Sequence, residues 1–270
     1  MSREPRSADP AVRVVSLTCS NTEIVCALGC AGMLVGVDDH SDFPAEVVGR
    51  LPRVGPDLGV DVERVAALEP DLVLASLTVP GHEKVVAAVE AAGLPYLAPE
   101  PTSLADVCRD VRDVGRRLGV AARGEALAAE MEAAFAAAAE TATHDDGRRP
   151  SILVQWWPKP VIAPGSLSWV DELIALAGGV NPLAGEAVKS RPLPDDEVAA
   201  LAPDAMVLSW CGVAPEKVRD DVVYAKAAWA GLAFVRERKV FKVPEAVLGR
   251  PSPRLLDGLA ALRVVVARSR

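Results

Sequence analysis

The chain has 270 residues, of which half are hydrophobic and only 4% aromatic, and it carries a formal net charge of −8. This composition argues against nucleic-acid binding, which requires a basic patch, and no run of about 18 uncharged apolar residues indicates a membrane span. The length allows one large domain or two lobes of about 120 to 150 residues.

The first half of the chain alternates short apolar strands with helices. Residues 12–18 form a β-branched run typical of a buried strand, and Ser20, Asn21 and Thr22 offer N-cap chemistry for the helix that follows. The loop at 39–61 is long for a plain connection, so we expect it to have a function. Further strands are expected at 33–38, 72–76 and 94–99, and further helices at 62–68, 81–92 and 103–118.

The second half follows a long helix. Residues 121–143 are rich in Ala and Glu and contain no Pro, which predicts a helix of about 30 Å. After a polar break the alternation of strands and helices resumes. Strands are expected at 152–157 and 239–244, and helices at 168–179, 215–228 and 252–268.

One short unit occurs twice. DVERVAALEPDLVLASL at 61–77 and DDEVAALAPDAMVLSW at 195–210 each combine an acidic helix start, an amphipathic helix, a Pro-Asp stop and an apolar strand. One copy on each side of the long helix predicts an α/β protein of two lobes with mostly parallel sheets. The expected divisions are an N-terminal tail at 1–11, a first lobe at 12–118, a bridging helix and linker at 119–146, and a second lobe at 147–270.

The five cysteines form an odd set without a C-x-x-C pair: Cys19, Cys26, Cys30, Cys108 and Cys211. This pattern is typical of reduced, mostly buried thiols in a reducing compartment.

Five motifs in register carry a family resemblance: RVVSLTCSNTEIVCALG, VGVDDHSDFPAE, DVERVAALEPDLVLAS, IAPGSLSWVDELIALAGGVN and RPSPRLLDGLAAL. Over residues 12–268 the chain resembles the cobalamin-binding subunits of vitamin B12 ABC importers, which belong to the class III, helical-backbone binding proteins for metal chelates. The resemblance implies a Venus-flytrap fold, in which two Rossmann-like lobes are joined by one long bridging helix. It also implies non-enzymatic capture of a corrinoid or related metal chelate between the lobes, without a catalytic cofactor, and we expect a monomer.

The resemblance assigns a role to the acids of the repeated unit. In the family, an acidic residue near the start of this helix in each lobe docks onto arginines of the membrane permease. The matching positions are Glu63 in the first lobe and Asp196, with Glu197 beside it, in the second. A carboxylate in the first turn also complements the helix dipole without any partner, so both interpretations stay open.

The chain departs from the family where aromatic rings sandwich the ligand. A loop tyrosine is replaced by His40, whereas one family arginine is kept as Arg250. Other family rings fall on Asp57, Ser76, Ile162 and a position near Ser190. Trp157 and Trp210 end apparent strands, and the carboxyl ends of parallel strands are where α/β proteins bind ligands.

These patterns give the predicted site. The predicted ligand contacts are His40, Phe43, Trp157, Trp210, Arg250 and Cys19. His40 is either an axial ligand of the chelated metal or a solvated loop histidine among aspartates. Cys19 is either a low-pKa thiolate or a small buried residue.

The N-terminus has no apolar core before a cleavage site, so the sequence as printed is expected to be cytoplasmic. An importer subunit instead works in the periplasm or elsewhere outside the cytoplasm, which requires a removed leader. Two alternatives follow: an intracellular corrinoid carrier or sensor without a permease, or an enzyme that uses Cys19 and His40 as nucleophile and base.

Overall fold

The computed structural model describes residues 12–143 and 147–270, so the predicted tail at 1–11 and part of the predicted linker lie outside the described residues. The chain forms two compact units. Unit 1 contains the described residues through Glu100 together with Asp113–Gly124, and unit 2 contains Pro101–Arg112 and Glu125–Arg270. Helix α6 (Ala121–Thr143) begins in unit 1 and continues in unit 2, which confirms the single long bridging helix. The predicted lobe boundaries themselves stay predictions.

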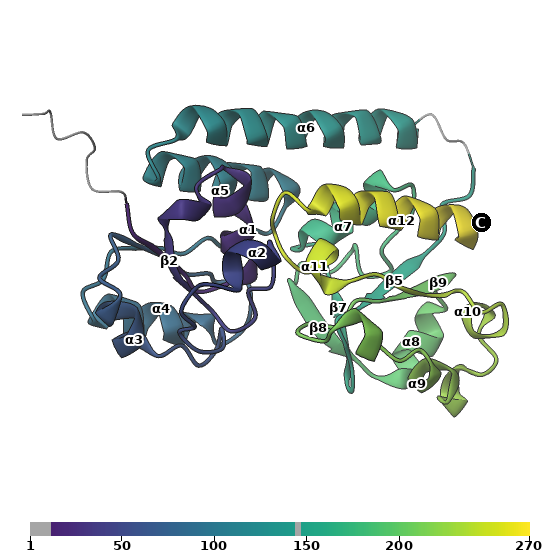
Figure 1. The fold of residues 1–270 in the computed structure, drawn as a ribbon. Coiled ribbons are helices and arrows are strands. Elements are labelled where there is room, and N and C mark those ends of the chain that lie inside the picture. Colours follow the sequence, from purple (N-terminus) through teal and green to yellow (C-terminus); the bar gives the residue numbers. More distant parts are fainter. Residues whose placement is uncertain (1–11, 144–146) are drawn as a thin grey trace, which may run out of the picture. The chain divides into compact units, whose positions relative to one another are not determined.

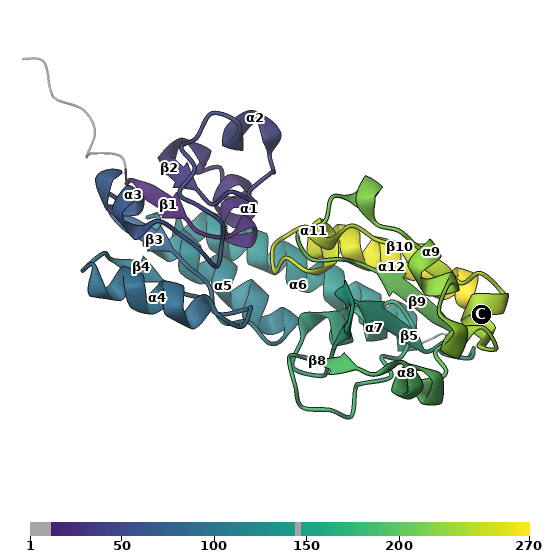
Figure 2. The same cartoon turned by 90° about the horizontal axis from the view of Figure 1, so that it is seen from below.

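Unit 1 is built on a four-stranded parallel sheet in the order β2-β1-β3-β4; Figure 1 labels β2 of this sheet, and Figure 2 labels all four strands. The strands are β1 (Val14–Ser16), β2 (Leu34–Val37), β3 (Leu72–Leu74) and β4 (Tyr96–Leu97). The helices are α1 (Cys19–Ala27), α2 (Ala45–Val48), α3 (Val62–Ala67) and α4 (His82–Ala91), with a 3-10 turn at Ala31–Met33; α5 (Leu104–Arg117) has residues in both units. Val65 of α3 and Val85 and Val89 of α4 pack in one core cluster with alternate residues of β1 and β3.

The predicted helix caps in unit 1 differ in outcome. Asp61 caps α3 as expected, because its side chain accepts from the Arg64 amide at 3.0 Å. The predicted cap at residues 20–22 is wrong, because α1 already begins at Cys19. Asn21 instead donates its side-chain amide to the Ala75 carbonyl at 2.6 Å, tying α1 to the end of β3.

Unit 2 contains a parallel sheet in the order β10-β9-β5 and a separate antiparallel sheet in the order β6-β7-β8. The strands are β5 (Ile152–Gln155), β6 (Trp157–Pro158), β7 (Val161–Pro164), β8 (Ser190–Leu193), β9 (Ala205–Leu208) and β10 (Val240–Lys242). The helices are α7 (Trp169–Leu176), α8 (Asp195–Leu201), α9 (Asp221–Tyr224), α10 (Ala233–Arg236), α11 (Glu245–Leu248) and α12 (Leu255–Ser269). Figures 1 and 2 show α7 and α12 on one side of the parallel sheet and α8 on the other.

Two predictions for unit 2 are wrong. The expected strand at 152–157 ends at Gln155, because the Trp156 amide donates to the Ile162 carbonyl at 2.8 Å and draws the chain into the antiparallel sheet. The expected helix at 215–228 is three short pieces: 3-10 turns at Pro215–Lys217 and Ala227–Trp229, with α9 between them. Extended backbone at Val218 and Lys226 separates the pieces.

The repeated unit has the same structure in both places, α3-β3 in unit 1 and α8-β9 in unit 2. The side chain of Asp71 accepts from the Arg13 amide at 2.8 Å, just before β1. In the same way, the side chain of Asp204 accepts from the Ser151 amide at 2.7 Å, just before β5. The Pro-Asp stop therefore ties the start of one strand to the start of its neighbour in each unit.

Candidate functional site

Buried polar side chains meet at the carboxyl end of the unit 1 sheet. Thr22 of α1 donates its hydroxyl to Ser16 Oγ at 2.9 Å and lies 2.8 Å from Ser41 Oγ. Ser41 donates in turn to the carboxylate of Asp38, the residue directly after β2. Burial raises the pKa of Asp38, although hydrogen bonds from Ser41 and from the His40 amide oppose that rise. These bonds fix the start of the loop that carries His40.

Arg53 secures the same loop from its far end. Its guanidinium Nη1 donates to the carbonyl oxygens of Asp38 and Ser41, both at 2.7 Å. A guanidinium that bridges two carbonyls restrains the backbone between them, because its donors lie in a rigid plane. The backbone at His40 is therefore held on both sides although its side chain is 48% exposed.

Two imidazoles flank one carboxylate in unit 1. Nε2 of His40 lies 3.7 Å from Oδ1 of Asp57, and Nε2 of His82 lies 3.5 Å from Oδ2 of the same carboxylate. His82 is buried, and its Nδ1 accepts from the Val79 amide at 3.3 Å, which places the ring proton on Nε2, facing Asp57. Within the described residues that Nε2 has no hydrogen-bond partner. The neighbouring His82 lowers the pKa of Asp57, so the carboxylate stays charged at neutral pH.

Two other predicted contacts follow strands of the same sheet. Cys19 is the first residue of α1, three positions after the last residue of β1, and is half-buried. Phe43 lies in the loop after β2, close to His40 in the chain, and its side chain is exposed. The sheet topology thus brings Cys19, His40 and Phe43 to one end of unit 1, because parallel strands present their carboxyl ends at the same edge. Their contacts with a ligand stay predictions.

The two predicted tryptophans of unit 2 have different environments. Trp157 is exposed in β6 and pairs with Ile162 of β7, so the expectation that it ends a parallel strand is wrong. Trp210 follows the parallel strand β9 and is buried in the unit 2 core. Its indole Nε1 donates to Oε1 of Gln155 at 2.8 Å, so its polar group is already used inside the protein. Trp157 is therefore the more accessible ring.

Arg250 is a buried cation between α11 and α12. Its Nε donates to Oε2 of Glu245 at 3.1 Å, and its side chain is 10% exposed. A charge at this depth requires a partner, because removing it from water is costly. Glu245 supplies that partner, so the position is structurally supported whether or not a ligand carboxylate reaches it.

The acids predicted to dock on a permease are not equivalent. Glu63 is exposed in the first turn of α3, and Asp196 is exposed in the first turn of α8. Glu197 instead accepts from Arg191 Nη1 at 3.0 Å, and this hydrogen bond lowers its pKa. Asp195 is paired with Lys226. Glu63 and Asp196 are therefore the accessible carboxylates of the two repeated helices.

Two features are absent from the residues that the structure describes. No group of three or more His, Cys, Asp or Glu side chains within 12–143 and 147–270 is arranged to hold a metal ion. In the same part of the chain, no helix combines the length and the apolar character that crossing a membrane requires. One exposed imidazole suffices to complete the coordination of a metal that arrives already chelated, and His40 offers one.

A two-unit α/β fold that presents several of the predicted ligand contacts after its parallel strands is typical of a ligand-binding protein. The family model described as "Periplasmic binding protein" matches residues 14–247, and the chain belongs to that family. The members are binding proteins rather than enzymes, so the alternative of an enzyme that uses Cys19 and His40 is not supported.

Three similar proteins refine this placement. An uncharacterized ABC transporter substrate-binding lipoprotein of Bacillus subtilis (strain 168), YvrC, is 27% identical over 93% of this chain and 78% of its own. A vitamin B12-binding protein of Vibrio parahaemolyticus is 25% identical over 93% of this chain and 88% of its own. The apo structure of the periplasmic heme-binding protein RhuT from Roseiflexus sp. RS-1 has a TM-score of 0.82 and 29% identity, covering 97% of this chain and 100% of the other.

Asp57 and His82 were not predicted as partners of His40. They are 25 positions apart in the chain and belong to a loop and to the start of α4, so no sequence spacing joins them. The available signal was that Asp57 stands where the family places an aromatic ring. A carboxylate in place of an aromatic ring indicates that this position has a different contact in this chain. Only the fold shows that the carboxylate of Asp57 lies beside His40 and His82.

Proposed function

We propose that the chain binds a metal macrocycle, a corrinoid or a heme, and delivers it to the permease of an ABC importer. The observation that carries this proposal is the exposed imidazole of His40, held at the carboxyl edge of unit 1 with Nε2 toward Asp57. A neutral imidazole is a good ligand for cobalt and iron, and a carboxylate beside one ring nitrogen favours the ring orientation that leaves the other nitrogen for the metal. With Nε2 facing Asp57, Nδ1 of His40 is the nitrogen left for the metal.

The relatives support a macrocycle but do not choose between two. The names of similar proteins specify vitamin B12 in one case and heme in another. We propose a corrinoid as the first candidate, because the five sequence motifs resemble cobalamin-binding subunits. Heme is the second candidate, supported by the 29% identity to RhuT, and both metals accept an axial imidazole.

A ligand panel tests the proposal. Purified protein is titrated with hydroxocobalamin, cyanocobalamin, cobinamide, heme and ferrichrome while tryptophan fluorescence is recorded. We expect saturable quenching by at least one macrocycle and none by ferrichrome, whose iron is already fully coordinated by hydroxamates. Saturation by ferrichrome alone, or by none of the five, would show that the proposed ligand class is wrong.

We further propose that Glu63 and Asp196 dock on the permease and that Glu197 does not. The support is that the first two carboxylates are exposed, whereas Glu197 is held by Arg191. The test measures association of the protein with its permease in nanodiscs. E63K and D196K should each weaken association about tenfold or more, as expected for loss of an interfacial charge pair. E216K, at an exposed acid of unit 2 outside the repeated helix, is the control; association unchanged in E63K and D196K would refute the docking roles.

The proposed role places the protein outside the cytoplasm, and the cytoplasmic location expected from the N-terminus gains no support from the relatives. YvrC is named a lipoprotein and RhuT a periplasmic protein. Fractionation of cells that express the natural gene from its own start, with a C-terminal epitope tag, tests this. Recovery of the tag with the cytoplasmic fraction would instead favour the intracellular carrier or sensor.

A further inference from the structure

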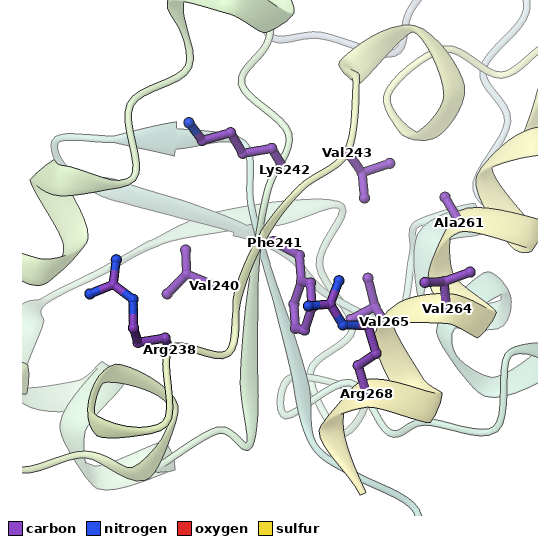
Figure 3. Close-up of a pocket in the computed structure, with 9 residues that line it drawn as sticks. All are labelled: Arg238, Val240, Phe241, Lys242, Val243, Ala261, Val264, Val265 and Arg268. Carbon is purple, nitrogen blue, oxygen red and sulfur yellow. The ribbon is translucent and has the colours of Figure 1, made fainter.

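A hollow of about 460 Å³ lies in unit 2 between the edge strand β10 and the helix α12, apart from the residues discussed so far (Figure 3). Figure 3 shows that the side chains stand on both sides of β10. Val240, Lys242 and Arg238 lie on one side, and Phe241 lies on the other with the residues of α12. The lining residues are Arg238, Val240, Phe241, Lys242, Val243, Ala261, Val264, Val265 and Arg268.

The backbone of β10 leaves hydrogen-bonding groups at the open edge of the sheet. β10 is the terminal strand of the order β10-β9-β5. The Lys239 carbonyl accepts from the Met206 amide, and the Val243 amide donates to the Leu208 carbonyl. The backbone N–H and C=O groups of the odd-numbered residues of β10 therefore point toward β9. In a parallel ladder the backbone groups of the residues between them point the opposite way. The amides and carbonyls of Val240 and Lys242 are therefore directed to the open edge, where another strand can pair with them.

The side chains beside this edge combine apolar surface with positive charge. Val264 of α12 is 57% exposed, which is high for a valine beside a hollow. Arg268 lies over the Phe241 ring with its Cζ 5.2 Å from the centroid, and Arg238 lies over the Tyr224 ring at 4.5 Å. Neither arginine forms an ion pair with any residue that the structure describes. Lys242 pairs with Asp220 at 2.9 Å.

The positive charge beside β10 favours an acidic binding partner. The whole chain has a net charge of −8, yet three cations line this one hollow. A second copy of the chain pairing edge to edge would bring like charges together, which disfavours self-association. An extended segment with carboxylates on alternate residues would instead meet Arg238 and Lys242, which lie on the same side of β10.

We propose that this hollow binds an extended acidic segment of a partner protein, which adds as a strand to β10. Backbone hydrogen bonds to Val240 and Lys242 would supply the pairing, and the side chains of Arg238 and Lys242 would select acidic side chains. Apolar side chains between the acids would cover Phe241 and Val264. The surface does not depend on the proposed ligand of His40.

The probe is an acetylated, amidated heptapeptide of alternating Glu and Val, titrated into the isotope-labelled full chain and followed by amide NMR. We expect the largest shifts at the Val240 and Lys242 amides and a dissociation constant on the order of 1 mM or tighter. A peptide with N-methyl groups on alternate Val residues keeps its charge and loses the edge hydrogen bonds, so it should bind at least about fivefold more weakly. The peptide of alternating Lys and Val should not bind.

A matched pair of variants locates the contact. R238E should weaken binding of the Glu-Val peptide about fivefold or more. R263E, an equal charge reversal on α12 outside the hollow, should change it less than about twofold. Circular dichroism of both variants verifies that they are folded.

Three results would overturn the proposal. They are an absence of shifts at Val240 and Lys242, undiminished binding of the N-methylated peptide, and equal effects of R238E and R263E. Binding of vesicles that contain anionic phosphatidylglycerol, without binding of the Glu-Val peptide, would identify the hollow as a membrane contact and equally refute the peptide partner.

Discussion

The two copies of the repeated unit agree at one end and differ at the other. Both helices end in a residue with positive φ before Pro-Asp, Glu69 (φ 48°) in the first copy and Ala202 (φ 41°) in the second. In both copies the following aspartate accepts from the amide that precedes the neighbouring strand. The shared part of the unit thus specifies how a helix turns into a parallel strand.

The copies differ in the parts that remain available for function. In the first, Asp61 caps the helix and Glu63 is exposed; in the second, neighbouring cations hold the acids on either side of Asp196. Both strands are followed by a buried serine, Ser76 and Ser209, but the next residue is the half-buried Leu77 in the first copy and the buried Trp210 in the second. The repeated part of the unit therefore forms the scaffold, and we expect the functional differences at the positions where the copies differ.

The largest effect is expected where the strand ends differ. Trp210→Ala should lower the free energy of unfolding by about 3 to 5 kcal/mol, because it empties a core position and leaves Gln155 Oε1 without its donor. Ser76→Ala, at the strand end of the first copy, should lower it by about 1 kcal/mol or less, because it removes only the bonds with Thr78. Urea unfolding followed by circular dichroism measures both, and similar values for the two variants would contradict the comparison.

The next effect concerns the shared aspartates. Asp204→Ala should cost about 2 kcal/mol of unfolding free energy and Asp71→Ala about 1 kcal/mol, since both lose a charged acceptor for a backbone amide. The larger value belongs to Asp204 because its side chain is only 18% exposed and also pairs with Arg148. Thermal unfolding of the two variants and the parent provides the test. A neutral effect at either position would mean that the Pro-Asp stop is not a structural tie.

A smaller effect is expected from Glu197, which Arg191 holds in an ion pair in the second copy. The hydrogen bond from Arg191 lowers the pKa of Glu197 in the folded protein. Its contribution is therefore present above the usual glutamate pKa of about 4.3 and is lost as the pH falls through the lower folded value. Glu197→Gln should thus lower the melting temperature at pH 7, with the difference from the parent shrinking toward pH 3.

Glu216→Gln is the control for that titration, because Glu216 is exposed in a 3-10 turn outside the repeated unit. Its melting temperature should follow that of the parent at every pH. A Glu197→Gln deficit that persists unchanged at pH 3 would contradict the assignment to Arg191.

The smallest effect on stability is expected at the exposed acids. E63K and D196K should each change the free energy of unfolding by less than about 0.5 kcal/mol, apart from a slight loss of the favourable helix-dipole interaction. Denaturant titration provides the measurement. A loss of 2 kcal/mol or more in either variant would show that the acid has a structural role, and any loss of permease association would then need another explanation.

The fold was largely predictable, because the spacing of apolar residues and the residues that end helices are both local features of the sequence. Pro70-Asp71 and Pro203-Asp204 marked both helix-to-strand turns, and the uninterrupted Ala-rich run marked α6. The antiparallel sheet was missed because the break at Trp156 depends on a bond to Ile162, which is not visible in a continuous apolar run.

The site was predictable only in part. His40 stood out because it occupies a loop position where the family has a tyrosine. The proximity of His40, Asp57 and His82 depends on how a loop packs against α4, and no local sequence pattern predicts that packing. Trp210 has the right place at a strand end, but its burial against Gln155 is a property of the whole core.

The measurement that tests the central claim most directly is the visible absorption spectrum of the protein saturated with the macrocycle that it binds. We predict that His40→Ala abolishes the imidazole-coordinated spectrum of bound hydroxocobalamin or heme. Asp39→Asn, a change at the exposed neighbour in the same loop, should preserve it. An identical spectrum in parent and His40→Ala protein would contradict the account, because it would show that His40 does not coordinate the metal.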